Sequence, residues 1–190
     1  MRDKGQFLSG RKLTTRPQVF LGTAANPFVP PFEWRGDHIG KKIAAGAQFI
    51  QTQYCYDVPL LRQFMEKVRE NKLHEKAFFL IGVGPLPSAK TGRWMKNNVP
   101  GVHIPEPVLE RIEKAKDQKA EGKQLCIDLI QEISEIEGVA GIHVMAYRQE
   151  EFVNEIIHAS GVMKNRKPRR APQPASNEAI EPGALAATAS

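Results

Sequence analysis

Four short apolar runs, each followed by a segment with helical spacing, constrain the fold of this chain more than any other feature. The runs lie at residues 18–25, 48–54, 77–82 and 139–145. Each is too short for a typical helix and is rich in β-branched or aromatic residues, a pattern typical of buried strands. Strands that alternate with helices predict a parallel sheet with right-handed crossover connections.

The segments between the runs have apolar residues at helical spacing and recognisable ends. In the second segment, Asp57 and Pro59 stand at the start, and Phe64 and Val68 follow at helical spacing. Residues 99–107 are rich in Pro and Gly and interrupt the alternation. The expected helices cover residues 35–46, 57–68, 88–97, 118–137 and 152–161.

Four βα units allow two architectures. A complete (βα)8 TIM barrel typically needs about 250 residues, whereas this chain has 190. The units therefore form either half of such a barrel or a small open sheet by themselves, and composition does not separate the two. The expected fold class is α/β, with one domain over 17–163 that follows a loop over 1–16.

The basic charge of the chain is concentrated in its last residues. Residues 164–190 hold five basic and two acidic side chains, so they contribute +3 of the formal +6 and leave +3 for residues 1–163. Four prolines and few large apolar groups predict a disordered tail there. Its basic cluster at 164–170 has no interleaved aromatic residues and no attached recognition fold, so we expect no nucleic-acid partner.

The sequence shows no pattern for targeting, membrane insertion or metal binding. No apolar run approaches the ~18 residues of a membrane span, and Met1 is followed by charged residues rather than by a signal core. Cys55 and Cys126 lack the spacing of a metal site. We expect a cytoplasmic protein with no membrane partner, no metal and two reduced, structural cysteines.

Polar side chains gather where the predicted strands end, which is where parallel βα folds carry their reactive groups. Because strand side chains alternate, Gln51 and Gln53 share one face with Phe49. Two amides at the end of a buried strand need hydrogen-bond partners. Either a ligand or a neighbouring loop would supply them.

The order and spacing of six motifs resemble those of the methylenetetrahydrofolate reductase family. They are Gly22-Thr-Ala-Ala-Asn-Pro27, Lys42-Ile-Ala-Ala-Gly-Ala47, Thr52-Gln-Tyr-Cys-Tyr-Asp57, Gly84-Pro-Leu86, Val99-Pro-Gly-Val-His-Ile-Pro105 and Met145-Ala-Tyr-Arg-Gln-Glu-Glu151. The resemblance covers about residues 5–162. It implies a (βα)8 TIM barrel of which this chain supplies the C-terminal four βα units.

The resemblance also implies an activity. The family uses FAD to pass hydride from NADH or NADPH to 5,10-methylenetetrahydrofolate, which yields 5-methyltetrahydrofolate for one-carbon metabolism and methionine biosynthesis. By the same resemblance, Ala24, Asn26, His38 and Lys42 match positions that contact the flavin. Gln53 matches the glutamine that contacts the folate pterin and, in turn, the nicotinamide.

Two further folate-contact positions depart from the family pattern. Thr91 stands where some relatives have a glutamine, and Arg148 lies one place earlier than the family's arginine. Arg148 would pair either with the glutamate tail or aminobenzoyl region of folate or with a helix residue in an ordinary salt bridge. As an alternative to contacting the flavin, Lys42 would lie with its neighbour Lys41 on a solvated helix face. The remaining histidines are expected to be structural or on the surface.

By resemblance, the family's catalytic general acid lies in the first half of the barrel, so no catalytic residue is expected in this chain. A half barrel exposes two sheet edges and part of a core, which predicts a need for a partner. That partner would be a separately encoded N-terminal half or a second copy. The alternative function is a noncatalytic half barrel that pairs with a partner subunit and binds flavin or folate without turnover.

Overall fold

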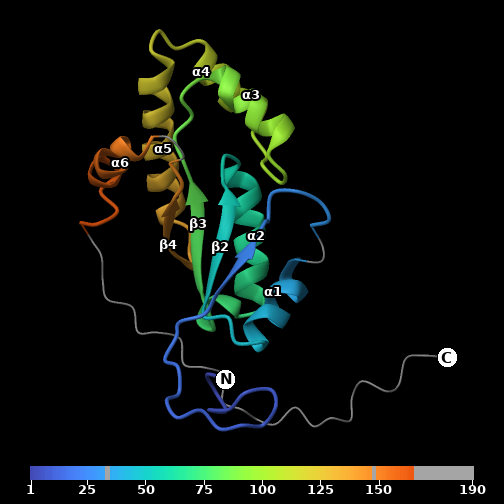
Figure 1. Ribbon diagram of the computed structural model, residues 1–190. Coiled ribbons are helices and arrows are strands. Elements are labelled where there is room, and N and C mark those ends of the chain that lie inside the picture. Colours follow the sequence, from blue (N-terminus) through green and yellow to red (C-terminus); the bar gives the residue numbers. More distant parts are fainter. Residues whose placement is uncertain (33–34, 147–148, 165–190) are drawn as a thin grey trace, which may run out of the picture.

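The computed structural model describes residues 1–32, 35–146 and 149–164 (Figure 1). Within these residues the sheet has four strands, all parallel, in the order β1-β2-β3-β4. The strands are β1 (Gly22–Ala25), β2 (Phe49–Tyr54), β3 (Phe78–Val83) and β4 (Val139–Val144). The predicted α/β class is confirmed: consecutive βα units with sequential strand order form part of a (βα)8 barrel.

Two of the helices lie beyond one end of the sheet. In Figure 1, α3 and α4 lie beyond the carboxyl ends of the strands, next to one end of α5. α4 was not predicted, because two prolines at its start resemble a continuation of the preceding loop. The helices are α1 (Arg35–Ala44), α2 (Val58–Glu70), α3 (Ala89–Asn98), α4 (Glu106–Glu113), α5 (Gln118–Ser134) and α6 (Val153–Ser160), with short 3-10 turns at Leu73–Glu75 and Glu150–Phe152.

Side-chain caps fix where three of the helices begin. Asp57 Oδ1 accepts the Leu60 backbone N–H at 2.9 Å at the start of α2. Ser88 and Asp117 make the corresponding bonds at the starts of α3 and α5. An N-cap of this kind stabilises a helix by about 1 kcal/mol.

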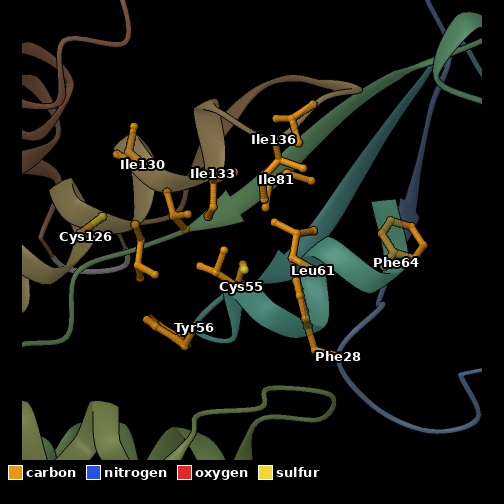
Figure 2. Close-up of a cluster of buried hydrophobic side chains, with 14 of the residues drawn as sticks. Phe28, Cys55, Tyr56, Leu61, Phe64, Ile81, Cys126, Ile130, Ile133 and Ile136 are labelled. Atoms are coloured by element: carbon orange, nitrogen blue, oxygen red, sulfur yellow. The ribbon is translucent and has the colours of Figure 1, made fainter. Parts of the chain in front are cut away.

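The core lies between one face of the sheet and helices α2 and α5 (Figure 2). Ile81 of β3, Leu61 of α2 and Ile133 of α5 belong to the same core cluster, and all three are fully buried. Burying an aliphatic side chain of this size contributes roughly 1.5 to 3 kcal/mol. These contacts hold the sheet and its two main helices together as one unit.

The opposite face of the sheet is not covered by described residues in the same way. Phe20 stacks on Phe49 with ring centroids 5.4 Å apart and lies 6.1 Å from Phe78. Val19 and Phe20 are 48% and 50% exposed. The prediction of a buried strand over 18–25 was therefore wrong at its beginning: the strand starts at Gly22, and the apolar residues just before it are exposed.

The segment before β1 is attached to the amino ends of the strands. Arg2 Nη1 donates to Gln48 Oε1 at 2.7 Å, and the same oxygen accepts the Leu21 backbone N–H.

Among the described residues, no helix is both long and apolar enough to cross a membrane. Of the predicted tail over 164–190, all but Lys164 lies outside the described residues.

Candidate functional site

A cavity of about 440 Å³ lies at the carboxyl ends of β1 and β2. Small-molecule sites typically have about 300 to 1,000 Å³. The cavity is lined by Ala24, Ala25, Asn26, Pro27, His38, Ile39, Lys42, Gln51, Thr52, Gln53, Phe64 and His143. Every flavin-contact position implied by the family resemblance, together with Gln53, is therefore found around one cavity.

The β1 side of the cavity combines small side chains with one cation. Ala24 and Ala25 leave room because they carry only a methyl group. Lys42 reaches back from the last turn of α1, and its Nζ donates to the Ala24 carbonyl at 2.6 Å. Lys42 is thus held at the cavity by a backbone contact, whereas the neighbouring Lys41 is exposed and does not line it.

A bulge in β2 sets the direction of the glutamines. The pairing of β2 with β3 shifts between Gln51 and Tyr54. At this point the Gly82 N–H donates to the hydroxyl of buried Thr52 at 2.9 Å, and that hydroxyl donates to the Gln53 carbonyl. Bulges of this kind redirect side chains next to binding sites. The Thr52 hydroxyl thus accepts a hydrogen bond that a backbone carbonyl of β2 would accept in a regular sheet.

The linker at 99–105 is attached to the rim of the cavity by side chains from two strand ends. Asn26 Nδ2 donates to the Gly101 carbonyl at 2.8 Å. Gln53 Nε2 lies 3.4 Å from the Pro100 carbonyl, while Gln53 Oε1 accepts the Tyr54 N–H at 3.0 Å. Gln53 therefore makes loop contacts, as one of the two sequence interpretations expected, and also lines the cavity.

A second attachment of the linker joins His103 to the start of α2. His103 Nε2 lies 3.2 Å from Asp57 Oδ2, and His103 forms an isolated parallel bridge with Cys55. The sequence analysis expects His103 to be structural or on the surface, because no carboxylate stands at ligand spacing from it. The carboxylate is 46 residues away in sequence, so spacing along the chain gave no sign of it.

His143 is a polar lining residue that sequence reasoning missed. It stands on β4, directly opposite Gly82 of β3. No described residue of β3 lines the cavity, and Gly82, the β3 residue in register with His143, has no side chain. The signal that could have found His143 is the alternation of Gly141, His143 and Met145 on one strand face.

Neither cysteine has the chemistry of a reactive site. Both are free and buried, and burial raises the pKa of the Cys55 and Cys126 thiols to about 12. Burial likewise raises the pKa of Tyr54 and Tyr56. In the described part of the chain, no three His, Cys, Asp or Glu side chains are close enough to hold a metal ion.

Two of the predicted folate contacts do not join this cavity. Thr91 does not line it; its hydroxyl lies 3.1 Å from Ser88 Oγ at the start of α3. Arg148 lies outside the described residues. Their assignment to folate stays a prediction.

The cavity offers hydrogen-bonding groups and a cation but no described carboxylate. Amides come from Asn26 and the two glutamines, imidazoles from His38 and His143, and the cation from Lys42. Such a site can orient a polar heterocycle and attract an anionic group.

Comparison with known proteins identifies a family and similar solved structures. The sequence model of the methylenetetrahydrofolate reductase family matches residues 23–161. No curated protein matches the chain. An uncharacterized protein from Clostridium thermocellum that binds two copies of 5-methyl-5,6,7,8-tetrahydrofolic acid has a similar structure, with a TM-score of 0.55 and 20% identity over 75% of this chain and 52% of that one. This chain thus spans about half the length of that protein and shares its fold.

Proposed function

The chain belongs to the methylenetetrahydrofolate reductase family, and from this premise we propose that its cavity binds a reduced folate next to FAD. The observation that carries the proposal is that Gln53 and the flavin-contact positions line one cavity. A reduced pteridine is a flat heterocycle with several hydrogen-bond donors and acceptors. The amides and imidazoles of the cavity match such a ring.

The residues around the cavity fit part of a flavin dinucleotide. Ala24 and Ala25 leave space for a flat ring, and Asn26 and His38 supply polar groups for ribityl hydroxyls. Lys42 supplies a cation that attracts a phosphate, after giving up its 2.6 Å contact with the Ala24 carbonyl. When bound, FAD would accept hydride from NADH or NADPH and pass it to 5,10-methylenetetrahydrofolate.

The role of Gln53 in this reaction is to orient the ring that exchanges hydride with the flavin. Its Nε2 lies 3.4 Å from the Pro100 carbonyl oxygen. This distance is long for a hydrogen bond, so breaking the contact costs little free energy. Once released, the amide offers both a donor and an acceptor to a pterin or to a nicotinamide carboxamide. The product of the family reaction is 5-methyltetrahydrofolate.

Binding without turnover is the second candidate. The observation that favours it is that no Asp or Glu is among the described residues lining the cavity, so these residues supply no carboxylic acid to protonate a substrate. In this case the chain would bind folate or flavin, and a partner subunit would supply the chemistry.

Binding measurements on the full chain test the proposal. We expect wild-type protein to bind 5-methyltetrahydrofolate and FAD in calorimetric titrations. Gln53→Ala should weaken folate binding roughly 5- to 100-fold, as the loss of one or two hydrogen bonds predicts, and leave FAD binding unchanged. Gln131→Ala, on the exposed side of α5, is the matched control.

Lysine variants test the flavin half separately. Lys42→Ala should weaken FAD binding, whereas Lys41→Ala should not, because Lys41 is exposed and does not line the cavity. Equal effects of the two variants would show that general positive charge, not this site, attracts the flavin. Turnover of NADH or NADPH with methylenetetrahydrofolate then separates catalysis from binding alone.

A further inference from the structure

We propose that His143 is a further ligand-contact residue of this cavity, and that its imidazole hydrogen-bonds a polar atom of the heterocycle bound there. The inference rests on the proposed function, because it names the heterocycle as a reduced pteridine. It adds a contact from β4 to those expected from β1, α1 and β2.

A glycine in β3 separates His143 of β4 from the glutamines of β2. Gly82 of β3 lies between β2 and β4, in register with His143. A Cβ added at Gly82 would lie 2.5 Å from Met145 Cε, 2.6 Å from the Thr52 carbonyl oxygen and 2.8 Å from the Gln53 carbonyl oxygen. The neighbouring strands therefore close tightly around the glycine, and His143 and Gln53 line the same cavity from either side of it.

One nitrogen of this ring has no hydrogen-bond partner among the described residues. His143 Nδ1 is shielded from solvent and has no hydrogen-bond partner among the described residues. Such an atom costs free energy in the folded protein. Because Nδ1 is shielded, Nε2 is the nitrogen that a ligand in the cavity can reach. A polar ring kept at a cavity wall without a protein partner is the arrangement expected of a ligand contact.

His74 provides an internal comparison. Its Nδ1 is also buried without a partner among the described residues. It lies in the 3-10 turn that precedes β3, at the amino end of the sheet, and it does not line the cavity. The two histidines share the unpaired nitrogen and differ in their relation to the cavity, so they can be tested side by side.

The experiment compares His143→Leu, His143→Gln and His74→Leu in the full chain, using thermal melts without ligand and titrations with 5-methyltetrahydrofolate. We expect His143→Leu to melt at or above the wild-type temperature, because an unpaired buried polar atom has been removed, and to bind the folate roughly 5- to 150-fold more weakly. His143→Gln, whose amide reaches the position of Nε2, should bind within about threefold of wild type on the same reasoning. His74→Leu should bind as wild type does.

Each result has a defined meaning. If His143→Leu melts at a lower temperature and both His143 variants bind folate as wild type does, His143 is a structural residue and the inference is overturned, while the folate proposal stands. Equal weakening by His143→Leu and His74→Leu would also overturn it, since the effect would not depend on the cavity. If wild-type protein does not bind the folate at all, the proposed function fails and the role of His143 fails with it.

Discussion

Replacing Gly82 with alanine should damage the fold and the cavity together. The added Cβ would lie 2.6 and 2.8 Å from two backbone carbonyl oxygens of β2. Backbone atoms in a sheet cannot move away as the end of a side chain can, so β2 and β3 must separate. Overpacking of this kind costs about 1 to 3 kcal/mol. For a chain of this size the melting temperature should fall by roughly 2 to 12 °C.

Gly141→Ala is the matched control on the neighbouring strand. Its Cβ would meet only Leu80 Cδ2, at 3.3 Å, and a leucine methyl group can shift by a few tenths of an ångström. Alanine also loses less backbone entropy on folding than glycine does, which stabilises a strand by about 0.5 to 1 kcal/mol. The free energy of unfolding of Gly141→Ala should therefore stay close to that of wild type.

Urea unfolding followed by circular dichroism measures both variants, and a folate titration of the folded protein measures the cavity. We expect Gly82→Ala to lose stability and folate binding, and Gly141→Ala to keep both. If Gly82→Ala unfolds at the wild-type urea concentration with the wild-type slope, the two strands are not held as closely as the carbonyl contacts indicate. The reasoning that a side chain at position 82 would push apart the strands that carry Gln53 and His143 would then be refuted.

Three further predictions concern the surroundings of the cavity. Burial raises the pKa of Cys55 and Cys126 to about 12, so at pH 8 only about one thiol in ten thousand is ionised. Ellman's reagent should therefore react with these cysteines only after denaturation. Rapid reaction of the native protein would contradict their burial. Asp57→Ala should lower the free energy of unfolding by about 1 kcal/mol. Asp57→Asn should lower it by much less, because asparagine also caps a helix. Equal losses in the two variants would point to the lost charge instead. Asn26→Ala should speed hydrogen exchange in the linker at 99–105 without changing exchange in β3, since it removes the bond to that linker.

Local sequence patterns were sufficient to predict β2, β3 and their helices. Both strands carry a dense apolar run, and the helix after β2 has a clear cap at Asp57. β1 was predicted too long, because apolar content alone does not show that Val19 and Phe20 lie on an edge with an open face. Helix α4 was missed because proline is compatible both with a loop and with the first turn of a helix.

The cavity was predicted in part. Ala24, Lys42 and Gln53 were found through the family resemblance, and all three line it. His143 was not found, because the alternation of Gly141, His143 and Met145 places them on one strand face but does not show which residues of other strands lie beside that face. That relation depends on the register of β4 against Gly82, and register between strands 60 residues apart is set by tertiary packing.

The bulge at Thr52 has a consequence for how binding specificity can evolve. Along β2, the buried Ile50 and Thr52 alternate with the half-buried Gln51 and Gln53, which line the cavity; Thr52 reaches the edge of the same cavity. A slip of one residue would exchange the two sets completely. The Thr52 hydroxyl, bonded to the Gly82 N–H, ties the strand to one alignment. Mutations can therefore change the glutamines, and with them the ligand, without altering which residues the fold depends on, as long as a hydroxyl remains at position 52.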